Sequence, residues 1–173
     1  MQKIKQEDMH QSMRGYFSGY LFNEMIDNKK IWLVTADLGY GVFDKIRDSF
    51  PERFLNTGAA EFAAAGICVG LAMEGYIPVF YSITTFGLYR PFEVWRNYVN
   101  KEKWPVKMAF SGRNKDYAHD GFSHDSSDAV KLFYPFTIFD NIKALWPKEK
   151  EEIPDLMNEF LYNKSPYFLS LKR

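Results

Sequence analysis

The chain has 173 residues, a length that suits one domain, and 46% of them are hydrophobic, so it can bury a sizeable core. Its 22 basic and 22 acidic residues give a formal net charge of zero, which argues against general electrostatic binding to nucleic acid or to an anionic membrane. A single cysteine excludes an intramolecular disulfide framework and a cysteine-rich zinc site, and no apolar run reaches the roughly 18 residues of a membrane helix. The polar first residues do not resemble a secretory signal, so we expect a soluble, cytoplasmic protein.

Apolar residues spaced by three and four predict helices, short apolar runs predict buried strands, and Gly and Pro mark the turns between them. In chain order, the predicted elements are a helix over 9–27, a strand over 31–35, a turn over 37–41, a helix over 42–50, a short strand over 53–56, a helix over 58–75, a strand over 77–81, a loop over 82–89, a helix over 91–99, a strand over 106–111, a loop over 112–124, a helix over 125–133, a strand over 136–139, a helix over 149–162 and a strand over 167–171. Residues 1–8 are expected to be a flexible tail and residues 9–173 one domain. Because strands alternate with helices, the sequence predicts an α/β fold with a doubly wound, mostly parallel sheet and helices on both faces.

In sheets of this kind the functional loops lie beyond the carboxyl ends of the strands. Three segments of the predicted fold meet that description, namely 36–41, 82–89 and 111–124. Candidate functional residues are therefore sought in these loops and at the helix that follows the second strand.

That helix, over 58–75, is rich in Ala and Gly and is small on nearly every face, so it allows close backbone approach on more than one side. Glu61 stands near its start among small apolar residues. One interpretation is an acid that the helix dipole favours. The other is a carboxylate held in an apolar cleft and suited to proton transfer. The local residues leave both open.

The loop DYAHDGFSHD, residues 116–125, collects histidine and aspartate. His119, Asp120, His124 and Asp125 can ligate a metal or bind a hydroxylated substrate. The alternative is a solvated loop in which Asp125 or Ser126 caps the next helix. Clustering of these residue types in a long loop of a compact domain favours function.

Two aromatic residues, Phe86 and Tyr89, lie in the loop predicted over 82–89, where core packing is the simpler interpretation. Cys68 has apolar neighbours and no cationic partner in sequence, so it is interpreted as a packing residue and not a nucleophile. The common nucleotide, metalloprotease and hydrolase signatures do not occur in the sequence.

Together, four segments resemble the pyrimidine-binding domain of the transketolase family of thiamine diphosphate enzymes, and the resemblance runs from Arg14 to Arg173. NTGAAEFAAAGICVGLAMEGYIPVF resembles the family's Asn, Gly, small residue and Glu followed by an Ala/Gly helix and a Gly-hydrophobic-Pro strand. The other three are TADL at 35–38, DGFSHD at 120–125 and the final SPYFLSLKR. Four motifs in family order make the resemblance specific.

The resemblance implies four cofactor-binding residues. Glu61 matches the catalytic glutamate that hydrogen-bonds N1′ of the aminopyrimidine, and this bond favours the tautomer whose exocyclic nitrogen removes the thiazolium C2 proton. Phe86 matches the aromatic residue that stacks on the pyrimidine, and Tyr89 matches a second aromatic wall residue. Asp37 matches an aspartate close to the cofactor.

The resemblance also implies substrate-binding residues. Asp120 and His124 match residues that contact the hydroxyls and the carbonyl of the substrate, with His124 acting at the reacting carbon and His119 beside them. Arg14 and Arg173 match the arginines that bind the substrate phosphate, a role that two guanidinium groups suit.

Three departures leave the choice of substrate open. Ser111, Gly112 and Arg113 stand where sugar-phosphate members carry a histidine. Gly41 stands where some members carry a phosphate-binding serine. Phe122 replaces the proline of the loop over 116–125, which we call the histidine loop.

A larger departure is that the sequence contains no Gly-Asp-Gly followed by a downstream Asn, the pair that holds Mg²⁺ and the diphosphate in family enzymes. No metal ligand is therefore assigned to this chain. The resemblance implies one half of a split enzyme, or a degenerate relative, whose partner is a separate diphosphate-binding subunit that holds Mg²⁺. Self-association into a heterotetramer is also expected, and the neutral, aromatic-rich composition agrees with a partner chain.

The expected activity is transfer of a two-carbon ketol unit between phosphorylated sugars. The alternatives are a subunit of a split 2-oxo acid decarboxylase or acyloin-forming enzyme, a non-catalytic regulatory subunit, and a hydrolase or metal-binding domain that uses the histidine loop. Nucleic acid and membrane are not expected as partners.

Overall fold

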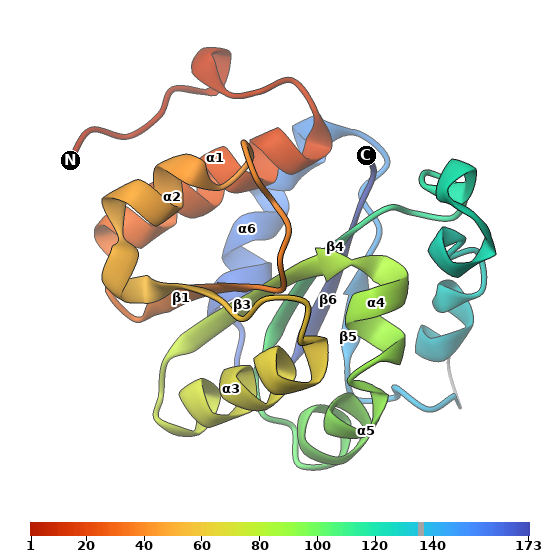
Figure 1. Ribbon diagram of the computed structural model, residues 1–173. Helices are drawn as coiled ribbons and strands as arrows, with labels where there is room; N and C mark the ends of the chain where they lie inside the picture. Colours follow the sequence, from red (N-terminus) through yellow and green to blue (C-terminus); the bar gives the residue numbers. More distant parts are fainter. Residues whose placement is uncertain (135–136) are drawn as a thin grey trace.

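The computed structural model describes residues 1–134 and 137–173. In this part of the chain six strands form one sheet, all parallel, in the order β2-β1-β3-β4-β6-β5 (Figure 1). The strands are β1 (Ile31–Thr35), β2 (Phe54–Asn56), β3 (Ile77–Ile83), β4 (Lys107–Ser111), β5 (Lys143–Leu145) and β6 (Tyr167–Leu171). The predicted single-domain α/β fold with a parallel sheet is confirmed.

Helices cover both faces of the sheet (Figure 1). They are α1 (Met13–Asp27), α2 (Asp44–Ser49), α3 (Glu61–Met73), α4 (Thr84–Tyr89), α5 (Phe92–Val94) with its π-helical continuation Trp95–Lys101, and α6 (Ile153–Tyr162). Short 3₁₀ turns occur at Gln6–Asp8, Pro51–Arg53, Ala118–Asp120, Phe122–His124, Ala129–Phe133 and Lys150–Glu152. Among the described helices, none is long and apolar enough to cross a membrane.

Each face of the sheet has its own hydrophobic core. Helices α1, α2 and α6 pack on one face with Leu33 and Tyr81, whereas α3, α4 and α5 pack on the other with Val34 and Phe80. Successive strand residues point to opposite faces, so a strand that is buried on both faces needs a continuous apolar run. This requirement explains why the predicted strands at 31–35 and 167–171 agree with β1 and β6.

The loop predicted over 82–89 is wrong, because β3 continues to Ile83 and α4 follows directly. Local sequence gives little sign of a helix here, since Thr and Gly are poor helix formers. Packing supplies the stabilisation instead. A Cβ on Gly87 would lie 2.8 Å from the Phe110 ring, so the glycine lets α4 lie directly on β4. The indole of Trp95 donates a hydrogen bond of 2.6 Å to the Gly87 carbonyl.

The predictions for 125–139 are also wrong where they can be compared. The helix expected over 125–133 is a 3₁₀ turn at Ala129–Phe133. Of the strand expected over 136–139, residue 136 lies outside the described residues and 137–139 form turns, while the edge strand is β5. The side chain of Asn100 explains the loop, because its amide donates to the Ile138 carbonyl and accepts from the backbone N–H of Asn141.

Two helix starts differ from the prediction because of their caps. Helix α1 begins at Met13 and not at residue 9, since Ser12 has extended backbone and its hydroxyl accepts from the N–H of Gly15. Before α6, a capping box between Glu149 and Glu152 first makes a 3₁₀ turn.

Residues 1–8, expected to be a flexible tail, lie along α1. The side-chain amide of Asn23 makes two hydrogen bonds with the backbone of Ile4, donating to its carbonyl at 2.9 Å and accepting from its N–H at 2.7 Å. Tyr20 donates a hydrogen bond of 2.7 Å to the Gln6 side chain. The segment therefore has specific partners on the helix.

Candidate functional site

The strand order creates a switch point at the carboxyl edge of the sheet. After β1 the chain moves out to the edge strand β2, and it then returns to place β3 on the other side of β1. Ligands of doubly wound folds bind where the connections diverge in this way. The segments that leave this edge are those carrying Asp37, α3 with Glu61 at its first turn, α4 and the loop over 112–124.

Glu61 is the first residue of α3 and is only 3% exposed. The guanidinium of Arg90, which directly follows α4, donates a hydrogen bond of 2.6 Å from Nη1 to Oε1 of Glu61. Burial of a carboxylate is unfavourable unless the charge is paired. The ion pair with Arg90 therefore offsets the cost of burying Glu61. Sequence reasoning missed Arg90. The available signal is its spacing of four residues from Phe86, which puts both on one helix face.

The ring of Phe86 contacts both Arg90 and His124. The Cζ atom of Arg90 is 4.0 Å from the centre of the Phe86 ring, a cation–π distance. The His124 ring is 4.8 Å from the Phe86 ring, nearly perpendicular to it at 72°. The structure thus brings together Glu61, Phe86 and His124, which come from three separate segments of the chain.

Tyr89, on the same short helix, is 38% exposed. Burial first, and hydrogen bonding with Asp128 second, raise the pKa of the Tyr89 phenol. A role as a second wall of a cofactor site stays a prediction.

Asp37 follows β1 and is exposed, with its backbone in the left-handed region at φ 54°. Its carboxylate accepts a hydrogen bond of 2.5 Å from Tyr40, and its N–H donates to the side chain of Asn56 at 2.9 Å. Asn56 also accepts from the N–H of Gly58 at 3.0 Å. Asn56 therefore ties the end of β1 to the turn before α3, a positioning role that sequence reasoning did not assign to it.

Arg14 and Arg173, from opposite ends of the domain, meet at one tyrosine. Arg14 Nη1 donates a hydrogen bond of 3.1 Å to the hydroxyl of Tyr117, and Arg173 Cζ lies 5.2 Å from the centre of the same ring. Tyr117 is 8% exposed. Gly112 makes room for it, because a Cβ there would lie 2.2 Å from the Tyr117 ring and the backbone has φ 86°. Sequence reasoning missed Tyr117, since only the folded loop brings it to the arginines.

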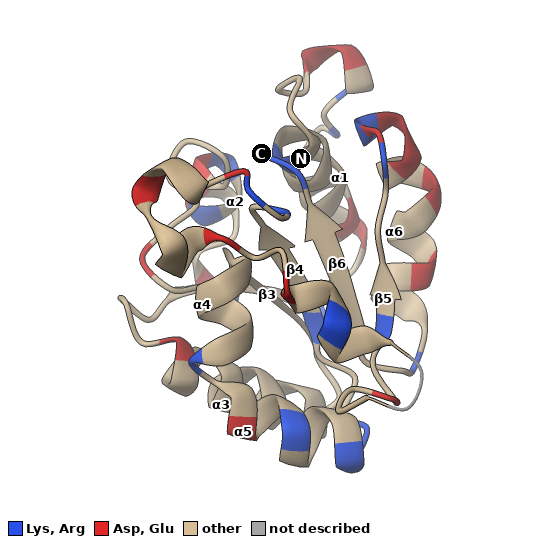
Figure 2. Cartoon of the chain, turned by 90° about the vertical axis from the view of Figure 1, so that its right-hand side faces the viewer, with Lys and Arg blue, Asp and Glu red and all other residues tan. Residues whose placement is uncertain are grey.

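The histidine loop divides into two groups. His124 belongs with Phe86, and its Nδ1 is 3.2 Å from the Ser123 hydroxyl. His119 belongs with Arg173, since its Nε2 lies 3.2 Å from Arg173 Nη1 and 3.5 Å from the Asp120 carboxylate. Figure 2 shows the basic chain end beside acidic residues of neighbouring segments.

A metal-binding role gains no support from the geometry. Over residues 1–134 and 137–173, no group of three or more His, Cys, Asp or Glu side chains is arranged to hold a metal ion. Cys68 is fully buried, and burial raises the pKa of its thiol, as suits a packing residue.

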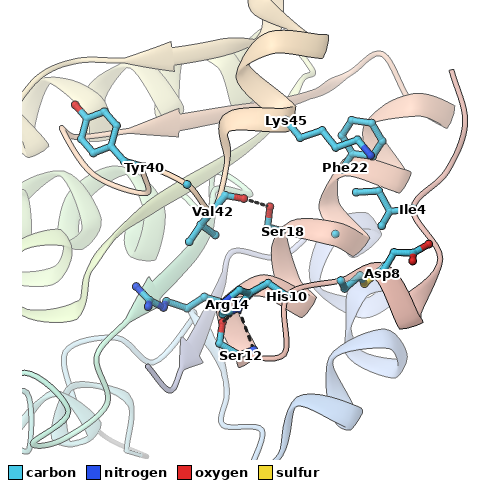
Figure 3. Close-up of a pocket in the computed structure, with 14 residues that line it drawn as sticks. Ile4, Asp8, His10, Ser12, Arg14, Ser18, Phe22, Tyr40, Val42 and Lys45 are labelled. Carbon is cyan, nitrogen blue, oxygen red and sulfur yellow. Dashed lines mark hydrogen bonds between the residues drawn. The ribbon is translucent and has the colours of Figure 1, made fainter.

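A pocket of about 450 Å³ lies between α1, the N-terminal segment and the turn after β1. Figure 3 shows Arg14 and Tyr40 at one end of it and Phe22, Lys45 and Ile4 at the other. Arg14 thus links the pocket to Tyr117, and Tyr40 links it to Asp37. The Glu61–Phe86 pair lies outside its lining.

The Glu61–Phe86 arrangement fits an aminopyrimidine. A buried carboxylate accepts a proton donor at 2.6 Å, and an aromatic face next to it already stacks a planar group at 4.0 Å. These two contacts are the ones by which a protein orients the ring of thiamine diphosphate in the resemblance described above.

Comparison with known proteins identifies the family of the chain. A family model described as the transketolase pyrimidine binding domain matches residues 10–173. The chain is 29% identical to 1-deoxy-D-xylulose-5-phosphate synthase from Clostridium botulinum, covering 98% of this chain and 27% of the relative. It is 25% identical to a Methanocaldococcus jannaschii protein provisionally described as a transketolase C-terminal section, covering 98% of this chain and 53% of the relative.

Solved structures give the same result. A split-gene transketolase, described as an inactive β4 tetramer, superposes with a TM-score of 0.79 at 25% identity over 94% of this chain and 51% of that one. Campylobacter jejuni transketolase superposes with a TM-score of 0.80 at 20% identity, over 94% of this chain and 26% of that one, which shows the shared fold. The chain thus spans about a quarter to a half of the length of these relatives. It belongs to the transketolase pyrimidine-binding domain family.

Proposed function

We propose that this chain supplies the pyrimidine-binding half of a thiamine diphosphate-dependent, transketolase-like active site. The observation that carries the proposal is the buried Glu61 carboxylate beside Phe86 at the switch point of the sheet. When bound, the cofactor supplies the carbon nucleophile needed to cleave and transfer a two-carbon ketol unit. A separate diphosphate-binding subunit would hold Mg²⁺ and the other half of the site.

The residues of this chain would orient the cofactor ring and hold one proton. Glu61 would share a proton with the ring nitrogen N1′, and its burial at the head of α3 keeps water away from that bond. Ala64 and Ala65, one turn further along α3, are fully buried and keep the helix close to the sheet. Phe86 would stack on the ring, and Tyr89 and Asp37 would complete the wall around it.

The surface of α3 supports a partner subunit. Phe62, Ile67 and Met73 on this helix are 55%, 38% and 46% exposed, which is unusual for large apolar side chains on one helix. Gly66 and Gly70 line a groove of about 370 Å³ between α3 and the helix after α4. Exposed apolar groups beside small residues are typical of a protein interface, so we assign this face to the diphosphate-binding subunit.

Calorimetry with thiamine diphosphate and Mg²⁺ tests the proposal. The chain alone is expected to bind the cofactor weakly, because it offers the ring two contacts and its sequence lacks the Gly-Asp-Gly and downstream Asn that hold Mg²⁺ and the diphosphate in family enzymes. The mixture with the diphosphate-binding subunit is expected to bind it tightly. Micromolar binding by the chain alone would contradict the proposal.

For the substrate, we infer that Arg14 and Arg173 bind a phosphate while His119, Asp120 and His124 contact hydroxyls and the carbonyl. Both arginines face Tyr117, so they border one space. A second candidate substrate is an unphosphorylated 2-oxo acid, because Arg113 stands where sugar-phosphate members carry a histidine and its guanidinium donates to the Pro147 carbonyl at 2.8 Å.

Replacing Arg14 distinguishes the two substrate classes. If the substrate carries a phosphate, Arg14→Ala in the assembled enzyme should raise KM by about one to two orders of magnitude, since a charge-assisted hydrogen bond is worth roughly 1.5–3 kcal/mol. The KM of an unphosphorylated analogue should barely change. If Arg14→Ala changes the KM of both substrates equally, the phosphate-binding role is wrong and the reaction of an unphosphorylated 2-oxo acid is favoured.

A further inference from the structure

Arg90 makes two contacts that a bound aminopyrimidine would also make. Its guanidinium donates a hydrogen bond of 2.6 Å to Oε1 of Glu61 and lies 4.0 Å over the ring of Phe86. A guanidinium is planar and cationic, and it stacks on aromatic faces while it donates to carboxylates. An aminopyrimidine that carries a proton on N1′ has the same two properties.

His124 and Arg90 both contact the ring of Phe86. His124 is packed against Phe86 at 4.8 Å, edge to face. Arg90 contacts both the Phe86 ring and the Glu61 carboxylate, so a planar ligand that makes both contacts needs the place of its guanidinium.

Burial determines which partner can leave. The side chain of Glu61 is 3% exposed, whereas that of Arg90 is 48% exposed. The guanidinium can reach solvent, whereas the carboxylate stays buried and then needs a new proton donor, which a ring protonated at N1′ would supply. Arg90 follows α4 directly and belongs to neither α3 nor the sheet.

From these contacts we infer that Arg90 is a further residue of the pyrimidine site, occupying the place of the aminopyrimidine until the cofactor displaces it. In the free chain Arg90 compensates the charge of Glu61 and keeps Glu61 and Phe86 in the arrangement that the ring needs. The same contacts compete with the ring, so Arg90 lowers the affinity for the cofactor. This inference rests on the proposed function.

Removal of Arg90 tests the competition. Thiamine diphosphate with Mg²⁺ is titrated by calorimetry into the complex of this chain with its diphosphate-binding subunit. Arg90→Ala should bind the cofactor about three- to thirty-fold more tightly, because an exposed cation–π contact and a half-exposed ion pair no longer compete. Arg96→Ala, which removes an exposed arginine on the following helix, should bind as the wild type does. Equal or weaker binding by Arg90→Ala would overturn the inference.

A second measurement needs no variant and remains informative if Arg90→Ala folds poorly. The Nε–H resonance of Arg90 in the wild-type chain should be shifted by the ring current of Phe86. Addition of the cofactor to the complex should return it toward the position of a solvated arginine. A resonance that keeps its ring-current shift in the saturated complex would overturn the inference.

The outcomes also separate the inference from the proposed function. If no complex binds the cofactor, both are contradicted. If the wild-type complex binds it and Arg90 keeps its contacts, the proposed function stands and the inference alone is lost.

Discussion

Buried charged side chains occur at both ends of the sheet. Glu61 lies beyond the carboxyl edge, and Lys107 is the first residue of β4 at the opposite edge, 1% exposed. The Lys107 ammonium donates hydrogen bonds of 2.6 and 2.7 Å to the carbonyls of Asn163 and Ser165, just after α6. It thus ties the end of α6 to the sheet and has a structural role, whereas Glu61 has no such role in the core.

Lys107 should make stability depend on pH. Burial, followed by repulsion from Lys143, lowers the pKa of Lys107 from 10.5 to about 7. Above about pH 7 the unfolded chain therefore binds more protons at this residue than the folded chain, so its contribution to stability rises with pH, by up to about 1.4 kcal/mol per pH unit. Urea unfolding from about pH 6 to about pH 9.5 should show this rise relative to Lys107→Met.

The control for that series is Lys101→Met, since Lys101 is exposed. Its pH profile should parallel that of the wild type. If the profile of Lys107→Met also runs parallel to the wild type, the assigned pKa of Lys107 is wrong.

At the scale of elements, α3 contains two glycines, Gly66 and Gly70, that the packing within this chain does not require. A Cβ on Gly66 or Gly70 would meet nothing within 4 Å, and both glycines are exposed. Glycine in a helix interior costs roughly 0.5–1 kcal/mol relative to alanine. The cost is understandable if another backbone approaches this face closely.

Substitutions of Gly70 test that explanation. Gly70→Ala should stabilise the isolated chain by roughly 0.5–1 kcal/mol in urea unfolding, because it improves helix propensity without a clash. Gly70→Leu should fill the groove and weaken association with the diphosphate-binding subunit in sedimentation velocity. Asn158→Leu, an exposed position on α6, should associate normally. If Gly70→Leu associates normally, the assignment of this face of α3 to the diphosphate-binding subunit is wrong.

Sequence alone predicted the elements whose apolar pattern is decisive. The runs that become β1 and β6 are buried on both faces, so their pattern has one interpretation. Helix α4 could not be predicted, because the packing of Gly87 on Phe110 and the Trp95–Gly87 hydrogen bond stabilise it only in the folded chain. The three-residue edge strand β5 was missed for the same reason, since only pairing with β6 identifies it.

The candidate site divides in the same way. Glu61, Phe86 and His124 were named from motifs, and the structure brings them together. Arg90 and Tyr117 could not be named, because their contacts depend on where α4 and the loop after β4 come to lie.

At the scale of the whole molecule, the proposed function makes this domain one half of an active site. Its parallel sheet places Glu61, Phe86 and the histidine loop along one edge, and the exposed apolar face of α3 adjoins that edge through Glu61 at the head of the helix. The central claim is that Glu61 of this chain controls a proton on a cofactor held together with a second subunit.

Hydrogen–deuterium exchange at C2 of thiamine diphosphate, in the complex of this chain with its diphosphate-binding subunit, tests that claim most directly. The wild-type complex should accelerate exchange over the free cofactor. Glu61→Gln should lower the rate by about 10²–10⁴-fold while leaving the complex assembled, the range expected for loss of general acid–base help. Glu7→Gln, at an exposed acid in the N-terminal 3₁₀ turn Gln6–Asp8, should exchange at the wild-type rate. Exchange at the wild-type rate in Glu61→Gln, or none above the free cofactor in the wild type, would contradict the account.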